Sequence, residues 1–464
     1  MMQKLNLRKR VVLLAGFLIT GLSLSVFGQL QVTGQGADLF IQNATLLTIT
    51  NGTIENGAVW IQNGKIKAVG RNLAVPDNAR VVDASRKYVM PGIIDSHSHM
   101  AIEGGINEFT GQVTPEVSIE DVIRHDDISL QRALAGGVVA INTLHGSANV
   151  IGGQNAIIKL KFGKPAEQLF IPGAMKGLKF ALGENPKRSN FQTSAEKKFP
   201  ATRMGIEVTL RDAFTRAKEY MRRWDEYEKK RAGKLPKNQW EKKAGLTPPR
   251  KDLRMETLIE VLKGERSPIV HAYRADEMLM IMQVAEDFGF KIGSFEHCLE
   301  GYKIADEIAR HGAIASIFAD MWGYKMEAFD AIPYDAAVLT EHGVLVTINS
   351  DSEERTRRLY QEAAKTIKYG GISEEDALKM ITLNPAKMLH IDDRMGSLEV
   401  GKDGDLAIFS GHPFSVYSKV EMTIVEGDIL FDLAQAKTTA KVLADAAASK
   451  NKTESNTKNK EGQR

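Results

Sequence analysis

Short apolar runs recur along the central part of this chain, and helical patterns separate them. The runs cover residues 88–96, 138–144, 168–175, 177–183, 267–272, 291–296, 313–317 and 344–350. Residues 156–161 compete with 168–175 for the third place in this series. Strands that alternate with helices form parallel sheets, and eight such units in roughly 300 residues favour a closed barrel over an open sheet. We therefore predict an α/β chain with a (β/α)8 TIM-type barrel.

Both flanks of this central region have the sequence pattern of short strands joined by tight turns. Between 38 and 86, the dipeptide Asn63-Gly64 separates two apolar runs, which is a strong hairpin signal. Between 405 and 431, a Glu-Gly-Asp turn at 426–428 separates two further runs. We expect the two flanks to form one small β-sandwich domain. Its predicted parts are 29–86 and 387–435, and the predicted barrel is 87–386.

One long insertion interrupts the barrel pattern at about 185–254. It contains a predicted amphipathic helix, 209–231, that is dense in Arg and Lys but also carries Glu and Asp. Mixed charge of this kind is typical of a solvated helix face, and a lid over the barrel mouth is the alternative. Residues 436–464 are polar and repetitive, and we expect this tail to be a frayed helix followed by disorder.

The first 28 residues have the organisation of a secretory signal peptide. Four basic side chains precede the apolar segment 11–27, and cleavage is expected near Gly28. The segment is short for a membrane span, and no basic stop-transfer flank follows it. We expect a periplasmic or secreted protein without a stable membrane span after cleavage, and an uncleaved anchor is the alternative.

The overall charge and the cysteine count limit which partners the protein can bind and which covalent cross-links it can form. The chain has 61 basic and 58 acidic residues, a net charge of +3, and loss of the four leader cations leaves −1. This balance predicts neither nucleic-acid binding nor a polybasic surface. Cys298 is the only cysteine, so no internal disulfide can form and stability must come from packing.

Residues 91–99, PGIIDSHSH, carry two histidines at the end of an apolar run. Side chains two residues apart on a strand point the same way, so His97 and His99 present two imidazoles on one face. Two imidazoles at this spacing can bind one metal ion.

Other predicted strands also end in side chains that suit a metal site. Catalytic groups of such barrels lie at the carboxyl ends of the strands. Besides the histidine pair, Lys179, His271, His297 and Asp351 occupy such ends. The whole collection is far more specific than any one member, and it predicts a metal centre at the barrel mouth.

These motifs together resemble those of the amidohydrolase superfamily, close to its imidazolonepropionase-like and prolidase-like secreted members. The resemblance covers about residues 38–434. It depends on PGIIDSHSH at 91–99, VHA at 270–272, EH at 296–297, NSD at 349–351, LNPAK at 383–387 and the segment 396–406. It implies a metal-dependent hydrolase on a (β/α)8 barrel, with a β-sandwich formed from both termini.

The resemblance also implies a role for each side chain at the strand ends. His97 and His99 match the family's first-strand metal ligands, and His271 and His297 match those of the fifth and sixth strands. Asp351 matches the eighth-strand carboxylate, which binds metal and handles the proton of the attacking water.

Lys179 matches a fourth-strand lysine that, in members with two metal ions, is carboxylated by carbon dioxide and bridges the ions. An unmodified ammonium beside two divalent cations would be repelled, whereas a carboxylated lysine would not. Two alternatives remain open. Lys179 can extend out of the barrel rim, or Glu184 can form the bridge, since a carboxylate needs no modification.

Nitrogen and oxygen ligands favour zinc, at one or two ions per chain, with manganese or iron as alternatives. Two such cations lower the pKa of a shared water, and one polarises the substrate carbonyl. Asp351 then carries the proton to the leaving nitrogen.

Three further residues are candidates for substrate binding. Tyr273 and Arg274 closely follow His271, and an Arg suits a substrate carboxylate. A rim salt bridge with Asp276 or Glu277 is the alternative for Arg274. His145 ends the second predicted strand, and a loop hydrogen bond is its alternative.

The sequence therefore predicts an exported metal-dependent hydrolase of a C–N bond in a dipeptide, an N-acyl amino acid or a cyclic amide. One alternative is a mononuclear deaminase or imidazolone-ring hydrolase with Lys179 unmodified, and another is a non-catalytic binding homologue. The expected partner is a small-molecule or dipeptide substrate, not nucleic acid. The resemblance also implies that association into a homo-oligomer is common.

Overall fold

A computed structural model describes residues 38–188 and 199–441 of the chain. The predicted leader, 1–28, lies outside these residues, as does the part of the predicted tail beyond 441. Residues 433–441 are helical. Within the described ranges, no helix combines the length and the apolar character needed to cross a bilayer.

The strands fall into three sheets. They are β1 (Leu39–Leu47), β2 (Thr53–Gln62), β3 (Lys65–Arg71), β4 (Arg80–Asp83), β5 (Tyr88–Pro91), β6 (Ile93–Ser98), β7 (Val138–Thr143), β8 (Ile151–Gln154), β9 (Ala156–Lys159), β10 (Gly177–Ala181), β11 (Ser267–Ala272), β12 (Ser294–His297), β13 (Ile314–Ile317), β14 (Val346–Ile348), β15 (Leu406–Phe409), β16 (Val420–Val425) and β17 (Asp428–Asp432).

The helices lie between these strands. They are α2 (Ile128–Leu134), α3 (Glu184–Arg188), α4 (Arg203–Arg231), α5 (Gln239–Ala244), α6 (Leu253–Leu262), α7 (Ala275–Phe288), α8 (Ala305–His311), α9 (Asp335–Glu341), α10 (Glu353–Thr356), α11 (Leu359–Gly370), α12 (Glu374–Lys379) and α13 (Leu383–Met388). Short 3-10 turns occupy Ile119–Val122, Ala166–Gln168, Gly301–Ile304 and Met326–Ala328.

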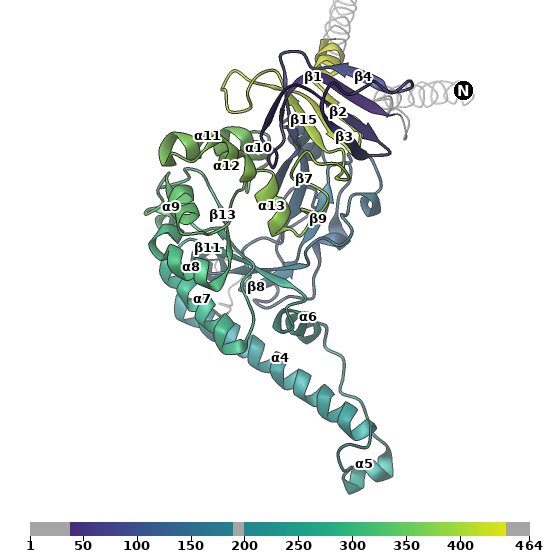
Figure 1. Cartoon of the computed structure of the whole chain (residues 1–464). Helices are drawn as coiled ribbons and strands as arrows, with labels where there is room; N and C mark the ends of the chain where they lie inside the picture. The colour runs from purple at the N-terminus through teal and green to yellow at the C-terminus, as the bar shows by residue number, and fades with distance from the viewer. Residues whose placement is uncertain (1–37, 189–198, 442–464) are drawn as a thin grey trace, which may run out of the picture.

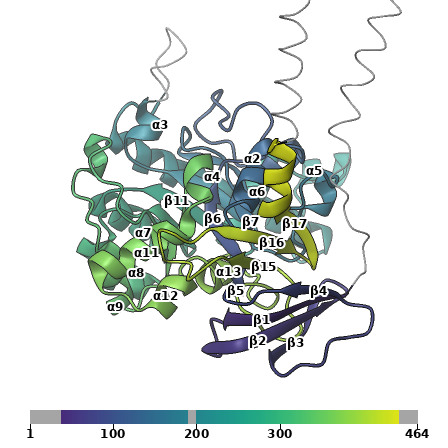
Figure 2. The ribbon, with the colours of Figure 1, turned by 90° about the horizontal axis from the view of Figure 1, so that it is seen from above.

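One sheet combines strands from both flanks of the chain. Its order is β17-β16-β15-β5-β1-β2-β3, and β4 pairs with β1. The turn between β2 and β3 is Asn63-Gly64, with φ of 52° and 75°, because this tight hairpin needs left-handed backbone at both positions. The antiparallel pairing of β15 with β5 joins the two flanks. Figures 1 and 2 show this sheet on one side of the molecule, away from α7–α9.

The central region forms an α/β layer that positions the candidate site. A six-stranded sheet has the order β14-β13-β12-β11-β10-β8, and a three-stranded sheet has the order β6-β7-β9. Neighbouring strands from β10 to β14 are parallel. Their carboxyl ends therefore meet on one side, which we call the carboxyl side. The opposite side, where these strands begin, is called the amino side.

Helix α7 illustrates why these segments fold as they do. Met278, Ile281 and Ala285 recur at helical spacing, and all three are buried. The helix ends at Gly289, whose φ of 82° is left-handed, a backbone conformation that glycine adopts without a Cβ clash. The chain then reverses and enters β12.

Two sequence predictions about strands were wrong. The run 88–96 is not one strand, because β5 and β6 lie in different sheets and meet at Gly92. A Cβ atom at Gly92 would lie 2.3 Å from a methyl carbon of Val139, so only glycine fits this passage between the sheets. The run 168–175 is also not a strand, and its competitor within 156–161 forms β9, which pairs with β7.

Candidate metal centre

The carboxyl side of the parallel strands gathers the side chains that the sequence singled out. His97 lies in β6, His99 just after it, Lys179 in β10, His271 in β11, His297 at the end of β12, and Asp351 shortly after β14. The backbone N–H of Asp351 donates to the carbonyl oxygen of His97 at 3.1 Å, which ties the loop after β14 to β6.

Three atoms form a triangle of the size of one face of a zinc tetrahedron. His97 Nε2 lies 3.4 Å from His99 Nε2 and 3.6 Å from Asp351 Oδ1, and His99 Nε2 lies 3.2 Å from the same oxygen. Ligands bound tetrahedrally at zinc–nitrogen distances of about 2.0–2.1 Å lie roughly 3.3 Å apart. The three side chains therefore fit one metal ion.

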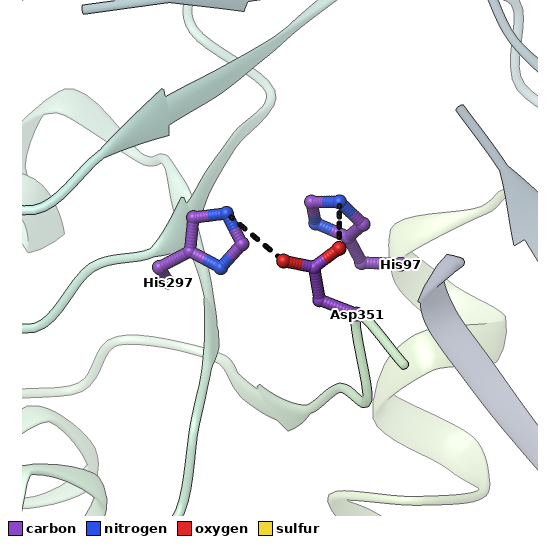
Figure 3. Close-up of side chains that lie close together, drawn as sticks. All are labelled: His97, His297 and Asp351. Atoms are coloured by element: carbon purple, nitrogen blue, oxygen red, sulfur yellow. Dashed lines mark ion pairs between the residues drawn. The ribbon is translucent and has the colours of Figure 1, made fainter. Parts of the chain in front are cut away.

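Asp351 also faces a third imidazole, that of His297. Its other oxygen, Oδ2, lies 3.9 Å from His297 Nε2, so the carboxylate lies between the rings of His97 and His297 (Figure 3). The ligand atoms of these three residues are all within 4.8 Å of one another. The rings of His271 and His297 are 4.6 Å apart.

Two buried nitrogens in this cluster have no hydrogen-bond partner among the described residues. They are His271 Nε2 and His297 Nδ1. A buried polar atom without a partner costs free energy, typically about 1–3 kcal/mol, so such atoms are rare unless something else binds them. The unpaired nitrogens and the donor set of imidazoles and carboxylate fit a divalent metal such as zinc.

The protonation states also fit metal binding. Burial lowers the pKa of His97, His271 and His297 well below the ordinary value, so all three imidazoles are neutral at pH 7 and keep a free lone pair. Burial alone would raise the pKa of the Asp351 carboxyl. Positive charge on the adjacent His97, His99 or His297 outweighs burial and lowers that pKa below its usual range.

The backbone is strained where two of these side chains project. His297 has φ of 71° and Asp351 has φ of 44°, in the left-handed region that non-glycine residues rarely adopt. Cys298, next in the chain, has φ of 48° and is fully buried, with Sγ 3.6 Å from Met278 Sδ. Strain of this kind clusters at functional sites because the surrounding structure must enforce it.

The two candidates for a metal bridge lie in different places. Lys179 Nζ is fully buried and 3.4 Å from His97 Nε2. Burial lowers the pKa of Lys179 to about 8, against the opposing charges of Glu296 and Asp351. Glu184 lies in α3, and its backbone N–H donates to the Glu327 side chain. Lys179 therefore contacts a ring of the cluster directly, and the backbone of Glu184 contacts Glu327.

Glu296 is a site residue that the sequence reasoning quoted without giving it a role. Its Oε2 lies 2.9 Å from His97 Nδ1, and both side chains are fully buried. A carboxylate accepts, so His97 carries its proton on Nδ1 and turns Nε2 toward Asp351. Burial raises the pKa of Glu296, and the nearby Lys179 charge opposes that rise. The sequence signal that could have indicated this role is the position of Glu296 directly before the predicted ligand His297.

Glu296→Gln should weaken zinc binding roughly 10–100-fold, because the carboxylate no longer orients His97 or raises its basicity. Zinc affinity can be measured by competition with a coloured chelator. Glu286→Gln, an exposed position on α7, is the matched control and should bind zinc as the wild type does. Equal affinities for all three proteins would contradict an orienting role for Glu296.

The predicted substrate-binding residues differ in their surroundings. Tyr273 is buried, stacks on the His297 ring at 5.1 Å, and accepts a hydrogen bond from Tyr324 at 2.7 Å. Arg274 instead forms the rim salt bridge with Asp276, at 2.9 Å, which was the alternative for this residue. Its guanidinium is therefore already engaged with a carboxylate.

His145 also makes loop hydrogen bonds, which were the alternative to a substrate contact. Nδ1 lies 2.9 Å from the Gly146 carbonyl oxygen, and Nε2 accepts from the Glu108 backbone N–H at 3.1 Å. Burial lowers the pKa of this ring to about 4. Both nitrogens serve the loop backbone, so the structure does not place His145 as a substrate contact.

Solved structures and sequence relatives identify the group of proteins that shares this architecture. The crystal structure of an amidohydrolase from Thermotoga maritima MSB8 has a TM-score of 0.75 and 36% sequence identity, over 85% of this chain and 100% of that one. This chain belongs to the amidohydrolase superfamily. The Amidohydrolase family profile matches residues 264–431 of this amidohydrolase, which include His271, His297 and Asp351. The predicted family and the prediction of an enzyme are confirmed.

Two curated relatives align over most of the amidohydrolase. Amidohydrolase tasK of Hapsidospora irregularis is 28% identical over 401 residues, 81% of this chain, yet the chain spans only 40% of that relative. Imidazolonepropionase of Fusobacterium nucleatum is 23% identical over 399 residues, 76% of this chain and 85% of that protein.

Proposed function

We propose that this amidohydrolase hydrolyses a C–N bond of a dipeptide, an N-acyl amino acid or a cyclic amide. The observation that supports this most is the position of Asp351, with one oxygen 3.2 Å from His99 and the other 3.9 Å from His297. A carboxylate between two groups of imidazoles can contact metal and still reach a proton of the reacting water.

We also propose that the site takes two metal ions. His97, His99 and Asp351 would hold one ion, and His271 with His297 would hold the other. Lys179 would bridge them after its neutral amine forms an N–C bond with carbon dioxide and releases a proton. Its burial and its 3.4 Å distance from His97 Nε2 support this role.

The residues of the chain would divide the work as follows. Bound divalent metal supplies acidity to the water and polarises the scissile carbonyl. Asp351 takes a proton from the water and passes it to the leaving nitrogen. Glu296 keeps His97 oriented, while the buried Tyr273 and its partner Tyr324 cover one side of the cluster and exclude bulk water.

For the architecture, we propose that the two central sheets together form the predicted (β/α)8 barrel. The support is the set of contacts between β6 and the β13–β14 region. Ser96 Oγ lies 3.0 Å from Ser316 Oγ and 2.9 Å from Thr347 Oγ1, and the Asp351 backbone reaches His97.

The cellular location is likewise a proposal. The basic, apolar and small-residue order of residues 1–28 supports export by a Sec-type signal peptide. Export would bring the amidohydrolase to the periplasm or the medium, where small peptides and amides are accessible.

Metal analysis and chelation test the proposed function. We expect close to two zinc equivalents per chain, hydrolysis of members of a dipeptide and N-acyl amino acid panel, and loss of that activity after chelation with recovery on adding zinc. One equivalent would favour the mononuclear deaminase or imidazolone-ring hydrolase. Full activity after exhaustive chelation would contradict a metal-dependent reaction, and metal binding without turnover on amides and imidazolones would favour the binding homologue.

A further inference from the structure

The insertion between β10 and β11 builds an arm that leaves the body of the protein. Tyr220 in α4 marks its base, because its hydroxyl donates to Glu256 at 2.6 Å and accepts from the Asp252 backbone N–H at 3.2 Å. The chain thus departs after Tyr220 and returns at Asp252. We call residues 221–251 the arm, and Figure 1 shows it carrying α5 away from the other elements.

The arm projects on the amino side, opposite the metal centre. Near its start, α4 contacts the carboxyl side, where Arg203 lies 2.6 Å from Glu277 in the first turn of α7. Further along, Phe214 packs on Phe288 and Phe290 at the other end of α7. Since α7 leads from the carboxyl side back to the amino side, α4 follows it and extends beyond. The arm therefore cannot serve as the lid considered from the sequence.

The arm has its own stabilising side-chain contacts. Lys230 of α4 forms an ion pair with Glu241 of α5 at 2.9 Å, which closes the turn between the two helices. Asn238 and Glu241 form a reciprocal capping box that starts α5. These contacts give the end of the arm a defined shape.

The end of the arm concentrates positive charge. Residues 229–251, which we call the tip, contain nine lysines and arginines and one glutamate, a net charge of +8, whereas the whole chain has +3. No residue of the tip is buried. Six of its cations make no ion pair within the described part of the chain: Lys234, Lys237, Lys242, Lys243, Arg250 and Lys251.

An indole is exposed among these cations. Trp240 in α5 is 74% exposed, and Leu235 in the preceding turn is 37% exposed. Tryptophan combines an apolar body with an N–H donor, and this suits the headgroup level of a bilayer. Lysines around it would contact anionic headgroups.

We propose that the tip docks the protein onto a bilayer surface that carries anionic lipid headgroups. The charge complementarity and the exposed Trp240 favour this partner. Docking through the amino side would leave the metal centre on the far side of the protein, open to soluble substrate. The inference does not depend on the proposed hydrolysis.

Vesicle binding tests this proposal on the chain from Gln29, because the apolar leader would itself bind lipid. The vesicles contain either phosphatidylcholine alone or phosphatidylcholine with 30% phosphatidylglycerol. We expect binding only to the anionic vesicles, weakening as salt rises. The variant K234Q/K237Q/K242Q/K243Q should bind on the order of 100-fold more weakly, and W240A about tenfold more weakly.

A matched control removes four exposed lysines elsewhere on the surface, K67Q/K176Q/K368Q/K419Q, so both variants lose the same charge. The control should bind like the wild type, and thermal unfolding should show that every variant folds. Absent binding of the wild type to anionic vesicles, or equal losses in the two charge variants, would overturn the proposal. The proposal would also be overturned if the wild type did not bind vesicles and the tip variant sedimented with a different mass from the wild type. That result would indicate a second copy of the chain as the partner.

Discussion

Asp351→Asn should lower kcat/KM for any C–N substrate by about 10³-fold or more. Asn keeps the shape of the side chain but has no negative charge for metal and cannot take up a proton from water. The carboxylate also faces both His99, at 3.2 Å, and His297, at 3.9 Å. The loss should therefore appear mainly in kcat, measured with zinc in excess.

Asp276→Asn is the matched control for this experiment. Asp276 is a carboxylate on the same side of the protein, 60% exposed, and it pairs with Arg274. Its substitution should leave kcat within about twofold, since a surface ion pair contributes little. If Asp351→Asn kept more than a tenth of the wild-type rate, Asp351 would not be the proton carrier.

Lys159→Met should lower the free energy of unfolding by about 3–5 kcal/mol, because it leaves the buried carboxylate of Asp405 without its counterion. Lys159 Nζ lies 2.6 Å from Asp403, 2.8 Å from Asp405 and 3.0 Å from Glu426, and its side chain is 2% exposed. It extends from β9 and so joins the central region to the sheet built from both flanks. Arg394 still contacts Asp403 in the variant, so the carboxylate of Asp405 loses more of its stabilising charge than that of Asp403.

The effect of Lys159→Met should depend on pH in a defined direction. Burial opposes the charge of Lys159, but the three carboxylates raise its pKa above 10.5, so its stabilisation is present below pH 10.5 and is lost as pH rises through the raised value. Burial likewise opposes the charge of Asp403, but Lys159 lowers that pKa from 3.8 to about 2. This contribution is present above pH 3.8 and is lost as pH falls toward 2. The difference between wild type and variant should be largest between these limits.

Urea unfolding at pH 7 measures the stability difference. Lys161→Met is the control, since Lys161 is 22% exposed and pairs with Glu426, and it should cost about 1 kcal/mol or less. A loss in Lys159→Met no larger than in this control would contradict a buried electrostatic link between the two regions.

The candidate metal site could be predicted from local pattern because strand ends carry the signal. His97 and His99 alternate on one strand, and parallel strands end on one side, so spacing and topology together brought the ligands into one group. Glu296 was harder, because nothing in the sequence shows that its carboxylate turns toward a ring 199 positions earlier in the chain. Arg274 and His145 could not be assigned either, since their partners are backbone or rim groups of neighbouring loops.

Total charge also concealed a local feature. A net charge of +3 predicted no polybasic surface, yet the tip alone carries +8 and the rest of the chain is acidic. The net charge of the whole chain therefore hides the difference between the basic tip and the acidic remainder. Only the position of the tip, exposed at the end of a projecting helix pair, makes its charge available to a partner.

The amino-acid sequence by itself determined the α/β alternation, the Asn63-Gly64 hairpin, the family and the identity of the six candidate ligands, because these depend on periodicity and on chemistry that neighbours along the chain carry. Tertiary structure decided where 88–96 changes sheets, that 156–159 and not 168–175 forms a strand, that Lys179 lies beside His97, and that the arm points away from the site. Those outcomes depend on contacts between segments far apart in the chain, such as Val139 against Gly92, and no local pattern records them.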